Sequence, residues 1–213
     1  MEIILPIFLG ITLSSGGIIL PGLLNMTAVK ISLRDGRQRA VIFSLGATTV
    51  VLIQCYIAVT FAKFIDRNPE IKDLLQEIGL GVFLVLTIYF IFLAKTPRLK
   101  VDNEEEVVKL RSKTGEFFLG VLLSALNFFP IPYYVFVSIT LYTYGYFYFT
   151  PLYIFLFVAS AVIGTFSTFY LYIAFFKKIG TNAAFLMRNI NYIIGSITGL
   201  IALITFIRIM RGA

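Results

Sequence analysis

Residues 117–176 read FFLGVLLSALNFFPIPYYVFVSITLYTYGYFYFTPLYIFLFVASAVIGTFSTFYLYIAFF and contain no Asp, Glu, Lys, Arg or His. A transmembrane helix needs about 20 apolar residues, so this stretch is long enough for two membrane spans. Shorter charge-free blocks lie at 3–29, 40–62, 78–94 and 189–207. Together the blocks predict an all-α membrane protein with six transmembrane helices.

The composition excludes an ordinary soluble domain. The chain is 59% hydrophobic and only 14% charged, whereas a soluble domain of 213 residues needs far more polar surface. The first block has no basic segment before it, because Glu2 is acidic, and it lacks a small-x-small cleavage site. We therefore expect it to be a membrane span and not a cleaved signal peptide.

The basic residues predict the orientation in the membrane. Of the 18 Lys and Arg residues, 13 lie in the connections 30–39, 95–116 and 177–188, which alternate with connections that hold few. The positive-inside rule places those three connections in the cytoplasm. We therefore expect a multi-pass protein of the inner (plasma) membrane with both termini outside. The net charge of +7 is then a topology signal, and no nucleic-acid-binding motif accompanies it.

The sequence also contains an internal repeat. Residues 8–14, FLGITLS, align with residues 118–124, FLGVLLS, after a shift of 110 positions. Each half has an odd number of spans, so the second half must run inverted relative to the first, as in many secondary transporters. The prediction is two inverted three-helix repeats: 1–94 (spans about 3–29, 40–62 and 74–94), a charged cytoplasmic linker 95–116, and 117–213 (spans about 117–141, 150–176 and 189–208).

The first helix of each repeat carries residues that interrupt helices. Glycine adds conformational freedom, and proline removes a backbone donor and clashes with the preceding turn. Paired interruptions in matching helices point to a transporter's binding site, although small residues also serve close helix packing. The candidate substrate-binding residues lie at or near these breaks: Ser14, Ser15, Gly16, Gly17, Pro21, Gly22, Asn25, Gln54, Asn127, Pro130, Pro132, Tyr133 and Tyr134.

The membrane blocks contain no charged residue, so neutral groups would have to hold a charged substrate. Helix N-termini offer N–H groups to a carboxylate, and freed carbonyls can face an ammonium. Transition metals prefer Cys, His or carboxylate ligands, and the chain has one cysteine, Cys55, and no histidine. We therefore expect no metal site and no cofactor. No catalytic motif is visible, which argues against an enzyme.

Two sets of residues resemble a known family, the LysE/RhtB amino-acid exporters. Pro21-Gly22, Gly36-Arg37 and Gly46 are similar to the Pro-Gly, Gly-Arg and Gly signature of its first half. Asn127 stands where the family has Asn-Pro-Lys, but here Phe128 and Phe129 follow and the lysine has no equivalent. The resemblance covers nearly the whole chain.

The resemblance implies export of amino acids or related small zwitterions from the cytoplasm by alternating access. The absent lysine favours a less acidic, more apolar solute. The resemblance leaves the coupling ion unspecified and is compatible with a homo-oligomer in the bilayer. The alternatives are export of another solute, such as a metal ion, and a non-transporting membrane scaffold.

Overall fold

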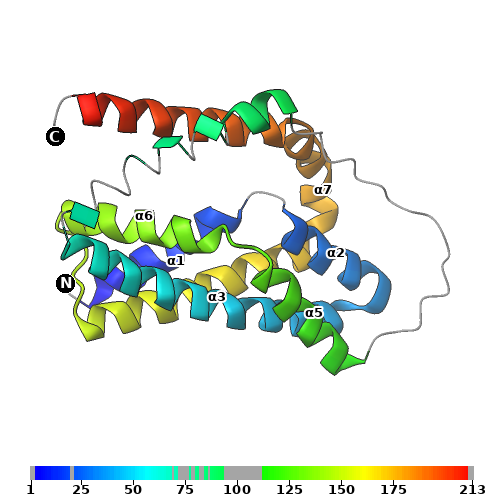
Figure 1. The fold of residues 1–213 in the computed structure, drawn as a ribbon. Helices are drawn as coiled ribbons and strands as arrows, with labels where there is room; N and C mark the ends of the chain where they lie inside the picture. Colours follow the sequence, from blue (N-terminus) through cyan, green and yellow to red (C-terminus); the bar gives the residue numbers. More distant parts are fainter. Residues whose placement is uncertain are drawn as a thin grey trace. The chain divides into compact units, whose positions relative to one another are not determined.

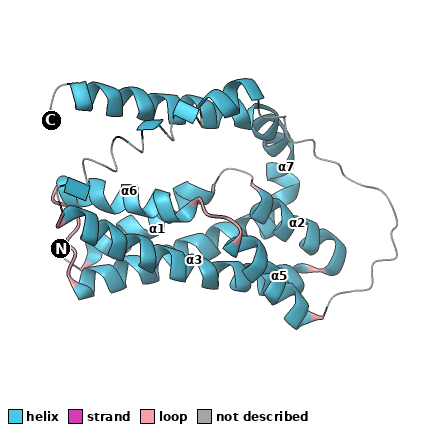
Figure 2. Ribbon diagram, viewed as in Figure 1, coloured by secondary structure: helices cyan, strands magenta, loops and turns pink. Residues whose placement is uncertain are grey.

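The computed structural model describes residues 3–19, 22–68, 70–71, 77, 80–81, 84–85, 87–93 and 112–210. Every regular element within these ranges is helical (Figure 2). The elements are α1 (Ile4–Ile18), α2 (Leu23–Asp35), α3 (Arg37–Asp66), the π-helical turn η1 (Tyr89–Leu93), α5 (Lys113–Ala125), α6 (Pro130–Thr143) and α7 (Pro151–Met210). Pro21 and the predicted linker up to residue 111 lie outside the described residues.

The chain divides into two compact units. The first comprises Met1–Phe64 and Glu105–Ile179, and the second comprises Ile65–Glu104 and Gly180–Ala213. The second unit brings together the predicted third span of each half, because Gly195 packs on Ile91 and Gly199 packs on Thr87. All of the candidate binding residues belong to the first unit.

Two segments of the first unit are long and apolar enough to cross a membrane as single helices. These are α3 and the Pro151–Phe175 part of α7. The α1–α2 pair and the α5–α6 pair also pass this test, but each is bent, by 80° and 61° respectively (Figure 1). Length and composition therefore give two to four spans within the described residues. The bends occur in the first helix of each predicted repeat, as the interrupting residues indicate.

The interruption of the first helix was predicted at Ser14–Gly17 and at Pro21-Gly22, and the structure agrees with the second position. Helix α1 continues through Ser14–Gly17 to Ile18, and α2 begins directly after Gly22. Ser14 is compatible with the helix, because its hydroxyl donates to the carbonyl of Ile11 one turn earlier at 3.1 Å. In the second half the break lies where Asn127 and Pro130 predict it, since α5 ends at Ala125 and α6 begins at Pro130. Pro130 and Pro132 lie in the first turn of α6, where a missing N–H costs nothing.

The connection expected at 177–188 is also helical, since α7 runs through it without interruption. This segment contains no proline, and its Ala183-Ala184 and Leu186-Met187 pairs are strong helix formers. The basic residues that indicated a loop are thus compatible with a helix. The predicted span 189–208 is the C-terminal part of α7.

Close helix crossings position the two bent pairs. The buried face of α1 consists of Pro6, Gly10 and Ser14, and that of α5 consists of Glu116, Gly120 and Ser124. A Cβ atom at Gly10 would lie 2.6 Å from the carbonyl oxygen of Phe157 in α7. A Cβ atom at Gly120 would lie 2.9 Å from the amide nitrogen of Ala47 in α3. Only glycine therefore allows these helices to approach so closely.

Candidate functional site

The break between α1 and α2 exposes two backbone carbonyls that have lost their helical donors. The carbonyl of Ile18 accepts a hydrogen bond from the Asn25 amide at 2.6 Å. The carbonyl of Ile19 accepts one from the Tyr172 hydroxyl of α7 at 2.7 Å. Each freed carbonyl thus has its own side-chain donor, which stabilises the bent conformation.

The free backbone carbonyls at the break between α5 and α6 accept their hydrogen bonds from a single residue. A single side-chain amide, that of Gln54 in α3, donates to the carbonyl of Ser124 at 3.3 Å and to that of Asn127 at 2.9 Å. The Asn127 side chain accepts from the backbone N–H of Phe129 at 3.3 Å, which shapes the local turn. Gln54 therefore connects α3 directly to this break.

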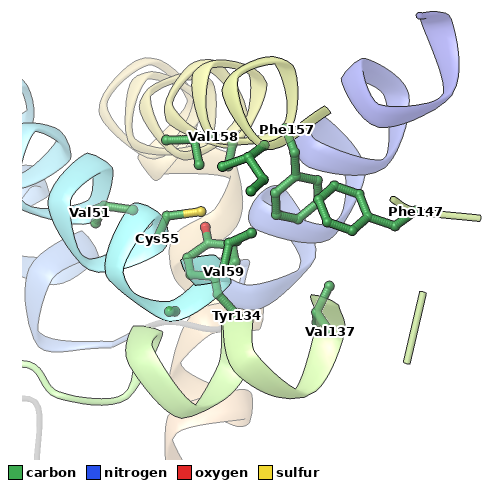
Figure 3. Packing of buried hydrophobic residues seen from close by; sticks show 11 residues of the cluster. Val51, Cys55, Val59, Tyr134, Val137, Phe147, Phe157 and Val158 are labelled. Atoms are coloured by element: carbon green, nitrogen blue, oxygen red, sulfur yellow. The ribbon is translucent and has the colours of Figure 1, made fainter. Parts of the chain in front are cut away.

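The helices of the first unit carry several buried polar side chains, and we refer to five of them as the central polar cluster: Ser14, Gln54, Ser124, Tyr134 and Thr165. The Tyr134 hydroxyl faces the hydroxyl groups of Thr165 and Ser14. Figure 3 shows Tyr134 reaching from α6 towards Cys55 of α3. The five residues come from α1, α3, α5, α6 and α7.

Three buried atoms of this cluster have no hydrogen-bond partner among the described residues. They are Gln54 Oε1, Ser124 Oγ and Thr165 Oγ1, the last of which faces the Tyr134 hydroxyl without meeting hydrogen-bond geometry. An unsatisfied buried polar group costs about 1–3 kcal/mol, and such groups in a native fold call for an explanation. A bound polar solute would satisfy them, since the amide oxygen accepts and the two hydroxyls can donate.

Aromatic and small side chains border the central polar cluster. The Tyr133 hydroxyl donates to the carbonyl of Leu13 at 2.6 Å, and the Ser15 hydroxyl donates to that of Gly164 at 3.2 Å. A Cβ atom at Gly17 would lie 2.9 Å from the Tyr133 ring. These residues hold α1 against α6 and α7 at the level of the first break.

The structure therefore brings together only part of the predicted binding set. Ser14, Gln54 and Tyr134 belong to the central polar cluster, and Asn25 and Asn127 lie at the breaks. The freed carbonyls that could have faced an ammonium group already have protein donors. Pro130 is buried in the first turn of α6, whereas Gly16, Gly22 and Pro132 are exposed, away from the cluster.

Residues of the family-like signature have identifiable structural roles. Gly36 has a φ of 92° between α2 and α3, a conformation that favours glycine. The Arg37 guanidinium lies 4.6 Å from the centre of the Tyr170 ring, a cation–π contact with α7. A Cβ atom at Gly46 would lie 2.9 Å from the carbonyl carbon of Phe117, so this glycine permits the α3–α5 crossing.

Two members of the cluster, Ser124 and Thr165, were missing from the predicted binding set. Ser124 carried a usable signal, because it occupies the repeat position that corresponds to Ser14. Thr165 has no comparable signal: it is one of several hydroxyl residues in an apolar stretch. Only the packing of α7 against α1 shows that it faces inward.

The second unit contains a cavity of about 330 Å³ with a different character. It is lined by Leu80, Leu84, Thr87, Gly199, Ala202, Leu203 and Phe206, which offer almost no polar surface. Such a lining provides little to recognise a zwitterion. Within the described residues, no group of three or more His, Cys, Asp or Glu side chains could hold a metal ion.

A family model described as LysE type translocator matches residues 16–208. The matched range includes both helix breaks and every member of the central polar cluster except Ser14. No curated protein and no solved structure matches the chain.

Proposed function

The chain belongs to the LysE type translocator family, and on this premise we propose that it exports amino acids or related small zwitterions from the cytoplasm. The family makes it a multi-pass membrane transport protein. The observation that carries the choice of solute is the central polar cluster, which includes three buried polar atoms without a partner among the described residues.

The chemistry of the cluster fits a zwitterion. Gln54 Oε1 can accept hydrogen bonds from an ammonium group, and the hydroxyls of Ser124 and Thr165 can donate to a carboxylate. No member of the cluster is charged, so a solute with no net charge enters without leaving an uncompensated buried charge. Tyr133 and Tyr134 add aromatic surface, which favours a solute with an apolar side chain over an acidic one.

We propose six spans arranged as two inverted three-helix repeats, with the charged linker 95–116 in the cytoplasm of an inner-membrane protein and both termini outside. The buried faces of α1 and α5 support this architecture. Pro6, Gly10 and Ser14 correspond to Glu116, Gly120 and Ser124 at the same 110-residue shift. Each glycine packs on the long second helix of the opposite half. Rocking of one repeat against the other would open the cluster to each side in turn.

An untargeted efflux experiment tests the proposal. Cells with and without the protein are loaded with mixed dipeptides, and the amino acids released into the medium are measured over time. We expect selective release of one or a few neutral amino acids. Release of only acidic solutes would refute the assignment of solute class.

Unchanged amino-acid efflux from cells in which the folded protein is present in the membrane would refute amino-acid export. Protection of those cells against a metal ion would then favour the alternative of a metal exporter. The absence of any solute flux would favour a scaffold.

A further inference from the structure

The connection between α6 and α7 carries exposed aromatic rings that the proposed transport function does not use. We call residues 142–150 the tyrosine turn. Its tyrosine side chains are 38–70% exposed, and they are Tyr142, Tyr144, Tyr146 and Tyr148. The turn contains no charged residue. Clusters of large exposed rings mark surfaces that bind a partner or a membrane.

The backbone holds the tyrosine turn in a defined conformation. Gly145 has a φ of 74°, a conformation that favours glycine. The N–H of Gly145 donates to the carbonyl of Tyr142 at 2.9 Å. The N–H of Tyr146 donates to the carbonyl of Leu141 at 2.8 Å. These two bonds form a Schellman motif at the end of α6, so the exposed rings start from an ordered backbone.

Side-chain packing joins the tyrosine turn to the core of the first unit. Phe147 is fully buried, and its ring centre lies 5.3 Å from that of Phe157 in α7 (Figure 3). The ring centres of Tyr148 and Tyr153 lie 5.4 Å apart. The turn is thus fixed to α7 through its buried phenylalanine, while the tyrosines on either side of Phe147 stay exposed.

The length of α7 between the tyrosine turn and a charged side chain that contacts this helix matches the apolar thickness of a bilayer. Arg37 of α3 lies over Tyr170 of α7, 4.6 Å from the ring centre. Tyr170 follows Pro151, the first residue of α7, by 19 positions, or about 28 Å at 1.5 Å per residue. The hydrocarbon core is about 30 Å thick. With the Arg37 guanidinium at one membrane surface, where a charge is tolerated, the tyrosine turn lies at the other.

The surface next to the tyrosine turn favours lipid over a protein partner. Leu152 and Phe155, at the start of α7, are also exposed. The segment Pro151–Phe175 is long and apolar enough to cross a membrane, so these two side chains belong to a surface that acyl chains cover. The tyrosine rings continue this surface and add hydroxyl groups at its end. Tyrosine suits the membrane interface because its ring is apolar and its hydroxyl is polar.

We propose that the tyrosine turn binds the glycerol and headgroup region of phospholipids in one leaflet and, together with Arg37 at the other surface, sets the depth of the first unit in the membrane. The hydroxyls donate to ester and phosphate oxygens, and the rings pack on the upper parts of the acyl chains. No charge takes part at the turn, so zwitterionic lipids suffice.

This depth places the central polar cluster near the bilayer midplane. Tyr134 precedes Tyr142 by eight positions, or about 12 Å along α6. Half of the hydrocarbon core is about 15 Å thick, so the Tyr134 side chain lies close to its middle. The inference does not depend on which solute the protein transports.

Fluorescence measures the depth of the turn, because the chain contains no tryptophan. Tyr146→Trp introduces a single tryptophan at an exposed position of the turn. The protein is placed in phosphatidylcholine nanodiscs, where both membrane surfaces are open to water, and the lipids carry bromine at defined depths. We expect the strongest quenching from bromine on the acyl carbons closest to the headgroup, and weak quenching by iodide in the water. Tyr144→Trp should give the same result at a second exposed position.

Ile163→Trp is the matched control, because Ile163 is an exposed residue of the membrane-crossing part of α7. It follows Pro151 by 12 positions, or about 18 Å, which is close to the middle of a core about 30 Å thick. Bromine near the ends of the acyl chains should quench it most, and iodide should not.

Two outcomes would overturn the inference. Quenching of both turn variants by iodide and not by brominated lipid would show that the rings lie in water, as a protein-binding surface does. Strongest quenching of the turn variants by the deepest bromine would show that the rings lie within the hydrocarbon and away from the headgroups.

A further variant tests whether the turn sets the depth. Tyr144→Ser and Tyr146→Ser, added to Ile163→Trp, remove two exposed rings while Phe147 keeps the turn on the core. We expect the quenching of the tryptophan to spread over a wider range of bromine depths, because the unit is held less firmly. Phe155→Leu, which removes an exposed ring from α7, should leave the profile unchanged. An unchanged profile in the double serine variant would overturn the role of the turn in setting the depth.

Discussion

The buried faces of α1 and α5 are alike at two positions and different at the third. Gly10 and Ser14 of α1 correspond to Gly120 and Ser124 of α5, but α1 has Pro6 where α5 has Glu116. The glycines make the same close crossing in both halves, so this part of the pattern is architectural. The difference places a buried carboxyl group in one half only.

We expect the largest loss of stability from adding a methyl group at the glycines where α1 and α5 cross their neighbouring helices. Gly120→Ala places a methyl group against the backbone of Phe43 and Ala47, and Gly10→Ala places one against the carbonyl of Phe157. Backbone atoms cannot rotate away, so each change should lower the free energy of unfolding by about 3 kcal/mol or more, the upper end of the cost of overpacking. Denaturation in detergent measures it.

Gly16→Ala is the matched control, because Gly16 lies in α1 and a methyl group added there would have no neighbouring atom within 4 Å. It should stabilise α1 by about 0.5–1 kcal/mol, the usual gain for glycine to alanine in a helix. If Gly120→Ala and Gly16→Ala behaved alike, the close crossing would not be a structural requirement.

The next largest loss of stability should come from the residue that supports the break between α5 and α6. Gln54→Leu removes the one amide that serves both the Ser124 and Asn127 carbonyls, and should cost about 2–3 kcal/mol because two buried acceptors lose their donor. Unfolding experiments measure the loss. A loss of stability smaller than that of Tyr172→Phe would contradict the idea that the break between α5 and α6 depends on one residue.

Tyr172→Phe should have a smaller effect. It removes one hydrogen bond, to the Ile19 carbonyl, while Asn25 still holds the neighbouring carbonyl of Ile18. We expect a loss of about 1 kcal/mol, typical of one such bond. The same unfolding experiment measures it, and a loss as large as that of Gln54→Leu would show that the first break is no better supported than the second.

The smallest effect on stability is expected at the paired serines. Ser14 donates to the Ile11 carbonyl, whereas Ser124 Oγ has no partner among the described residues. Ser14→Ala should therefore cost about 0.5–1 kcal/mol, and Ser124→Ala should be neutral or slightly stabilising. Equal losses in the two variants would indicate that Ser124 makes a structural hydrogen bond.

The sequence predicted the paired breaks because glycine and proline act locally. It misplaced only the Ser14–Gly17 part of the first break, because a helix end depends on distant donors. Asn25 and Tyr172 donate to the carbonyls of Ile18 and Ile19, so α1 continues past Gly16 and Gly17 and ends there. Proline breaks a helix in its interior, yet in the first turn, where Pro130 lies, it is well suited to begin one.

The candidate site was partly predictable for a similar reason. Ser14, Gln54 and Tyr134 stood out as polar residues in or near the interrupted helices. Thr165 became evident only from the α1–α7 crossing, which depends on tertiary packing. The burial of Glu116 was not predictable, because it borders a charge-free block, where an acid is expected to be solvated, and only the structure shows that it is buried.

The most direct test of the central claim is the rate of amino-acid efflux through a protein that lacks both unpartnered hydroxyls. Ser124→Ala combined with Thr165→Val should reach the membrane in normal amounts, since neither oxygen has a partner among the described residues. We predict a loss of about tenfold or more in efflux, equivalent to at least about 1.4 kcal/mol of binding free energy. Efflux at the wild-type rate would show that the central polar cluster does not bind the transported solute.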